Sequence, residues 1–78
     1  MLTKRVIRLR PEEVKMFVKA ACQCDFDIDV AAYQNHYVVD AKSILGILGM
    51  NLTQNLVVSY NGFNSEFEQV LNHLSLAS

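Results

Sequence analysis

The side chains in this sequence that could act as nucleophiles or proton carriers are two histidines and two cysteines. A neutral imidazole nitrogen can accept a proton or a phosphoryl group near neutral pH. His36 is expected in a turn between two strands, and His73 on the polar side of a C-terminal helix. Both positions suit catalysis poorly, so we interpret each as an ordinary surface histidine.

Cys22 and Cys24 form a C-x-C pair. Two residues apart on a helix, they would point about 200° away from each other. They could not hold one metal ion together, and no further cysteine or nearby histidine completes a zinc site. We interpret them as reduced cysteines, one packed and one near the surface, and we expect neither a metal nor a cofactor.

The charge pattern argues against a nucleic-acid partner. The net charge is −1, whereas nucleic-acid binders usually show a larger basic field. A short basic cluster near the N-terminus is followed at once by two glutamates: Lys4, Arg5, Arg8, Arg10, then Glu12 and Glu13. No apolar stretch approaches the roughly 20 residues of a transmembrane helix, and the first residues lack a secretory signal. We therefore expect a cytoplasmic protein.

Hydrophobic periodicity predicts three helices to position these groups. The first begins at Pro11 and ends near Cys24. A short second helix starts at Ser43 as its N-cap and ends in a left-handed turn at Gly49 or Asn51. A capping box over Ser65-Glu66-Phe67-Glu68 opens the last helix. Apolar residues at helical spacing give the first and last helices one buried stripe each: Val14, Phe17, Val18, Ala21, Cys22; and Phe67, Val70, Leu71, Leu74.

Four strands are predicted from β-forming residues and from alternation. They cover residues 4–9, 25–30, 37–39 and 56–60. The second has the clearest pattern, because Phe26, Ile28 and Val30 alternate with three aspartates. The turn pair Asn61-Gly62 closes the fourth.

The resulting order is β-α-β-β-α-β-α in a single domain spanning residues 1–78. Each helix has one apolar stripe and each strand one apolar face, which favours an α+β fold with a four-stranded antiparallel sheet and all helices on one side. These patterns leave a ferredoxin-like plait and related two-layer sandwiches nearly equivalent.

Residues 38–48 read Val-Val-Asp-Ala-Lys-Ser-Ile-Leu-Gly-Ile-Leu. This resembles the segment of HPr phosphocarrier proteins that leads from the third strand into a regulatory serine and a short second helix, V-[ND]-[AL]-K-S-I-[ML]-G-[VI]-[ML]. The element order, the length and the capped final helix also resemble that family. The resemblance implies the HPr fold, an open-faced β-sandwich, and a relation to the phosphoenolpyruvate-dependent sugar phosphotransferase system.

The second signature of the family, H-x-R-P at the start of the first helix, lacks its histidine here. In the family that histidine accepts phosphate from phosphoenolpyruvate through enzyme I. Aligning Arg10-Pro11 with the R-P places Arg8 in the histidine position. Alternatively, the first strand runs through Leu9 directly into the helix and the active-site loop is missing. We favour the second alignment, because the first would cut the strand short.

The local chemistry agrees with loss of histidine phosphotransfer. Arginine is permanently protonated and cannot act as the nucleophile. Glu12 and Glu13 lie at the helix N-terminus that would otherwise help to hold phosphate, and two carboxylates there would repel it. We therefore expect a protein that is not an enzyme and has no catalytic residue, with Arg8, Arg10 and Pro11 as a degenerate active-site region.

Two features implied by the resemblance could still be functional. Ser43 matches the regulatory serine that an ATP-dependent HPr kinase/phosphorylase modifies; alternatively it is a plain helix cap. Ile44, Leu45 and Leu48 match the apolar patch through which family members dock onto partners, although one stripe of this helix must be core.

The preferred hypothesis is a regulatory or adaptor protein in sugar-transport or catabolite regulation. Its expected partners are proteins: HPr kinase/phosphorylase, a transcription regulator or phosphotransferase components. A rival hypothesis is a phosphotransfer component with a non-standard acceptor such as His36. A weaker third treats Arg8 and Arg10 as an anion-binding spot for a small phosphorylated ligand.

Overall fold

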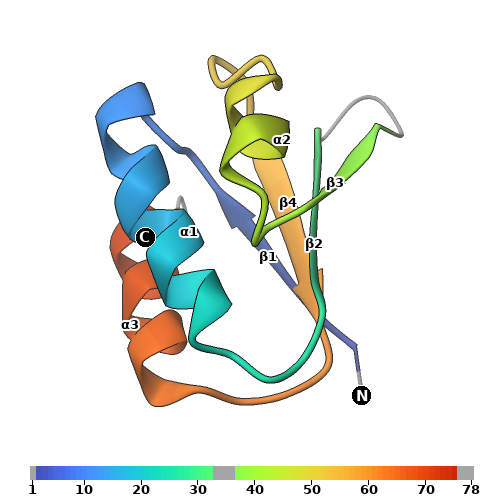
Figure 1. Ribbon diagram of the computed structural model, residues 1–78, viewed down its shortest axis with the longest axis vertical. Helices are drawn as coiled ribbons and strands as arrows, with labels where there is room; N and C mark the ends of the chain where they lie inside the picture. Colours follow the sequence, from blue (N-terminus) through green and yellow to red (C-terminus); the bar gives the residue numbers. More distant parts are fainter. Residues whose placement is uncertain (1, 33–36, 76–78) are drawn as a thin grey trace.

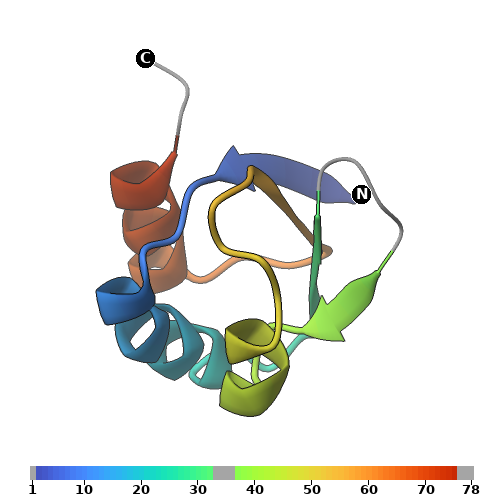
Figure 2. The ribbon, with the colours of Figure 1, turned by 90° about the horizontal axis from the view of Figure 1, so that it is seen from above.

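The computed structural model describes residues 2–32 and 37–75. Within them, four strands form one antiparallel sheet, and three helices cover one of its faces (Figures 1 and 2). The strands are β1 (Thr3–Ile7), β2 (Ile28–Ala32), β3 (Val38–Asp40) and β4 (Leu56–Tyr60). The helices are α1 (Val14–Cys22), preceded by a 3-10 turn at Pro11–Glu13, α2 (Ile44–Leu48) and α3 (Ser65–Leu74). This is the predicted α+β architecture.

The strand order in the sheet is β1-β4-β2-β3. β4 therefore lies in the centre, with Ile7 of β1 opposite Leu56 and Ile28 of β2 opposite Tyr60. Alternate residues of each strand point to the helices, because successive side chains of a strand lie on opposite faces. This strand order decides which of the two-layer α+β arrangements the protein adopts, a choice that the sequence patterns left open.

The core lies between the sheet and the helices. All the described residues of the core are hydrophobic, and none of the described buried residues is polar or charged. Three aromatic rings form its centre: Phe67 lies 6.0 Å from Phe17 and 5.5 Å from Tyr60, measured between ring centroids. These rings join α1 and α3 to β4, and the predicted stripes on both helices are confirmed except at Cys22, which is exposed.

One polar network ties α3 to the sheet. The Tyr60 hydroxyl donates a 2.5 Å hydrogen bond to one carboxylate oxygen of Glu68, and Arg5 of β1 donates to the other at 3.0 Å. Arg5 also donates to Asn72 at 2.7 Å. Burial, together with the bond to Glu68, raises the pKa of Tyr60 to about 12.

The first strand is shorter than predicted. It ends at Ile7, not at Leu9, and residues 8–10 form an irregular connection to the 3-10 turn at Pro11. Leu9 is nevertheless buried in the core. The ladder with β4 stops there because β4 begins at Leu56, which pairs with Ile7. The prediction that the strand runs directly into the helix is therefore wrong.

The second strand is displaced relative to the prediction. It covers Ile28–Ala32 rather than residues 25–30. Its partner β4 ends at Tyr60, so residues before Ile28 have no strand beside them. Phe26 instead leaves the ladder and stacks on Tyr60, with ring centroids 5.8 Å apart.

Two predicted helix boundaries are wrong in detail. No described residue has a positive φ, and Gly49 ends α2 in a right-handed conformation (φ −77°), so there is no left-handed turn. The N-cap of α3 is Asn64, not Ser65, because Asn64 is extended and its side chain accepts the Phe67 amide at 3.0 Å. Asn64 therefore satisfies the amide of Phe67, whereas the predicted capping box would have satisfied that of Glu68.

Candidate functional site

Ser43 lies at the start of α2 with its side chain exposed to solvent. Its backbone is extended, and its hydroxyl oxygen accepts the Gly46 amide at 3.0 Å, as expected for an N-cap. Gly46 is suited to this position, because an added Cβ would lie 3.1 Å from the hydroxyl oxygen and 3.4 Å from Cβ of Val39. The predicted cap is confirmed, and its hydroxyl lies at an accessible surface.

Three large aliphatic side chains of α2, the helix that this cap begins, are exposed. We name them the α2 patch: Ile44 is 42% exposed, Leu45 80% and Leu48 51%. Ile47, on the other side of the same helix, is completely buried. The helix thus has one core residue and three aliphatic residues that contact water.

The predicted degenerate active-site region lies next to the loop that follows α2. Arg8, Arg10 and Pro11 line a hollow of about 260 Å³ together with Leu9, Leu52 and Thr53. The Arg8 guanidinium donates to the carbonyl oxygen of Thr53 at 2.9 Å. The backbone amide of Arg8 donates to the carbonyl oxygen of Leu74 at 3.1 Å. Figure 2 shows the segment between β1 and α1 and the loop between α2 and β4 running past each other. The fold therefore brings this region and α2 to the same end of the molecule.

A carboxylate already occupies the helix start at this hollow. Glu13 accepts the backbone amide of Arg10 at 3.0 Å and the Arg10 guanidinium at 3.3 Å. These contacts, the backbone amide first, hold the pKa of Glu13 below its usual value. Arg10 is further paired with Glu12 at 3.7 Å. At Arg10, an incoming anion would therefore meet two carboxylates rather than a free guanidinium.

The histidines and cysteines take positions that the sequence predicted only in part. His73 is exposed, as expected, but its Nε2 lies 3.8 Å from Glu13, which the sequence did not reveal. His36 lies outside the described residues. Cys22 is exposed and Cys24 buried, which confirms that one is packed. Burial raises the pKa of the Cys24 thiol. No three potential ligands among the described residues gather at a metal site.

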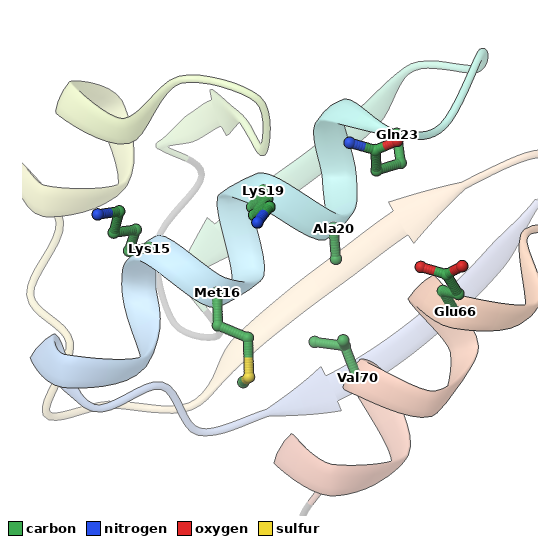
Figure 3. Close-up of a pocket in the computed structure, with 7 residues that line it drawn as sticks. All are labelled: Lys15, Met16, Lys19, Ala20, Gln23, Glu66 and Val70. Atoms are coloured by element: carbon green, nitrogen blue, oxygen red, sulfur yellow. The ribbon is translucent and has the colours of Figure 1, made fainter.

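Sequence reasoning missed a second hollow, which lies between α1 and α3. It has a volume of about 510 Å³, and Met16, Ala20 and Val70 form its apolar part. Figure 3 shows Met16 and Val70 extending toward each other from the two helices. Its remaining lining residues are polar: Lys15, Lys19, Gln23 and Glu66. None of the histidines and cysteines considered above lines it.

The four-stranded antiparallel sheet with its three helices on one face is a small open-faced β-sandwich. The family described as "PTS HPr component phosphorylation site" matches residues 8–76. The chain belongs to this HPr family of the phosphotransferase system, whose members are phosphocarriers. No curated protein sequence matches the chain.

Solved HPr structures share the fold. The phosphocarrier protein HPr from Bacillus anthracis str. Ames superposes with a TM-score of 0.69 at 19% identity, over 95% of this chain and 98% of that one. HPr-C-His from Thermoanaerobacter tengcongensis gives 0.65 at 24% identity, over 94% and 88% of the two chains. In the described residues, no helix is long and apolar enough to cross a membrane.

Proposed function

We propose that this protein is a regulatory or adaptor member of the HPr family that binds protein partners through the α2 patch and does not carry phosphate on a histidine. It works in the cytoplasm, on the sugar phosphotransferase system or on the regulation linked to it. Its partners are an HPr kinase/phosphorylase, a transcription regulator or phosphotransferase components.

The observation that carries the proposal is the exposure of Leu45 beside an accessible Ser43. Leu45 is 80% exposed while Ile47, two residues along, is fully buried. Aliphatic side chains that gather on a surface mark interaction sites more often than scattered ones do. A partner that covers this patch would also contact the Ser43 hydroxyl, which couples binding to modification.

Phosphorylation of Ser43 is the proposed switch. A phosphate there adds nearly two negative charges and three acceptor oxygens. At the N-cap of α2 it would lie near the free amides of the first turn, which favour negative charge. The added charge would at the same time disfavour an apolar partner on Ile44 and Leu45.

Two arguments support the absence of histidine phosphotransfer. The sequence has no histidine before His36, so none stands at the start of the first helix. Glu13 already accepts the Arg10 amide there, and its charge would oppose a phosphoryl group.

The switch is tested by incubating the protein with ATP and an HPr kinase/phosphorylase and measuring intact masses. One added phosphoryl group on the wild type but not on Ser43→Ala is expected. If neither protein gains mass, Ser43 is only a helix cap. If Ser43→Ala also gains mass, the modified residue lies elsewhere.

The docking surface is tested separately by measuring affinity for the candidate partner proteins. Leu45→Glu should weaken binding at least about tenfold, as loss of a central interface contact does. Phe63→Glu is the matched control, because Phe63 is 76% exposed and lies outside the α2 patch. Equal losses in the two variants would contradict a role for the patch. Incubation with phosphoenolpyruvate and the general phosphotransferase enzymes should leave the protein unlabelled.

A further inference from the structure

The face of the sheet that points away from the helices carries two regular rows of side chains. The strand registers place one residue from each strand in each row. The first, which we name the apolar row, reads across β1, β4, β2 and β3 as Val6, Val57, Ala31, Val38. The second, the charged row, reads in the same order as Lys4, Ser59, Asp29, Asp40.

The apolar row is open to solvent at both edges of the sheet. Val38 on β3 is 54% exposed and Val6 on β1 is 36% exposed. Val57 and Ala31 between them are half-buried. All three described helices pack on the opposite face, as Figure 2 shows. The row therefore forms an aliphatic band across the full width of the sheet.

The charged row is polarised from one edge of the sheet to the other. Lys4 lies at the β1 edge, and none of the ion pairs between described residues involves it. Asp29 and Asp40 lie directly opposite each other at the β3 edge. Like charges in such cross-strand positions destabilise a sheet. Both acidic side chains would gain from a cation brought to this edge.

We propose that this open face binds a second copy of the chain in a face-to-face dimer, whose twofold axis runs along the strands between β2 and β4. That axis exchanges the two edges of the sheet. It places β1 over β3 of the second copy and β4 over β2, with each apolar row covering the other. Lys4 of each copy then faces Asp40 of the other.

The charges select this axis over the alternative. A twofold axis perpendicular to the strands places β1 on β1 and β3 on β3, which separates Lys4 from Asp40 and forms neither ion pair. Packed sheets lie about 10 Å apart with strands inclined by about 30°. A lysine side chain spans most of that gap, so the Lys4 contact tolerates the inclination.

The size of the face sets the strength of the dimer. Strands about 4.8 Å apart and rising about 3.3 Å per residue give a face of roughly 300 Å². A stable interface buries about 800 Å² on each partner. The dimer is therefore weak and forms as the concentration rises. The α2 patch lies on the helical side and stays free.

The test is a concentration series followed by sedimentation equilibrium and by amide chemical shifts. The mean mass should rise toward that of a dimer, and the shifts that change should lie on β1–β4. Val38→Thr, which keeps shape and strand propensity, should weaken association about fivefold. Lys4→Glu should weaken it by about the same factor, because two ion pairs are reversed in each dimer.

The charge exchange makes the test specific. Lys4→Glu combined with Asp40→Lys should restore association, since each pair is then reformed with its signs exchanged. Lys15→Glu changes the same charge on α1 and should leave association unchanged. A protein that stays monomeric up to its solubility limit overturns the proposal. Equal dimer affinities in all variants would also overturn it. Chemical-shift changes confined to the helices would overturn it too, because they would indicate another occupant or another interface.

Discussion

The backbone amide of Arg10 donates a hydrogen bond to the carboxylate of Glu13, with 3.0 Å between nitrogen and oxygen. The amide of Glu13 returns a 2.8 Å hydrogen bond to the carbonyl oxygen of Arg10. This reciprocal pair closes the first turn before α1. The carboxylate of Glu13 thus satisfies a backbone donor at the helix start with a charge from the chain itself.

Glu13→Gln should make the stability of the protein less dependent on pH. The pKa of Glu13 is lowered in the folded state, so its carboxylate contributes stability above the unfolded pKa of about 4.3 and loses it as the pH falls through the folded value. Urea unfolding should show the wild type modestly more stable than the variant at neutral pH. The difference should vanish in acid, and a constant difference across this range would contradict the assignment.

Tyr60→Phe should remove one late-titrating tyrosine. The pKa of Tyr60 is raised to about 12, so the hydroxyl contributes stability below the unfolded pKa of about 10, and this is lost as the pH rises toward 12. Ultraviolet titration of the wild type should show a tyrosine that ionises near pH 12. The variant should also lose about 2 kcal/mol at neutral pH, since the hydrogen bond to Glu68 is charged. An ultraviolet titration curve that is the same in Tyr60→Phe as in the wild type would contradict this prediction.

Gly62→Ala should destabilise the protein by about 1–3 kcal/mol, because the new methyl group would overlap the ring of Phe26. The ring cannot move freely, since it stacks on Tyr60. Gly49→Ala is the control: its Cβ would make only ordinary contacts of 3.4 Å or more with backbone oxygens. Thermal unfolding should separate the two variants, and similar melting temperatures would count against this packing.

Ile47→Ala should cost about 2–5 kcal/mol, as truncation of a fully buried isoleucine does. Leu45→Ala should change the free energy of unfolding by less than about 0.5 kcal/mol, because Leu45 is mostly exposed. Chemical denaturation of the two variants measures the contrast. A large loss in Leu45→Ala would place Leu45 in the core and remove it from the α2 patch.

Much of the fold could be predicted because the patterns that encode it are local. The last strand was predicted at the residues where it occurs, since Leu56–Tyr60 is a short β-rich run bounded by a turn. Ser43 was predicted as an N-cap because a serine before an apolar helical run has that preference in any fold. The stripes on α1 and α3 follow from helical spacing, although that spacing wrongly placed Cys22 on the buried side.

The errors fall where a segment depends on a partner far away in the chain. β1 stops at Ile7 because β4 starts at Leu56, and β2 starts late because β4 ends at Tyr60. The left-handed turn predicted at Gly49 is absent, because α2 ends without a positive φ. This error has a related cause, since Met50, the next residue, is buried in the core. No window of sequence contains such information.

For this protein the sequence by itself determined the elements, their order, the resemblance to HPr proteins and the lack of a histidine at the helix start. The tertiary structure decided which side of α2 is buried, and it placed His73 beside Glu13 and Lys4 in one row with Asp40. The physical reason is that periodicity and capping act within a few residues of the chain. Burial, strand register and charge pairing depend on surfaces that meet only when the chain has folded.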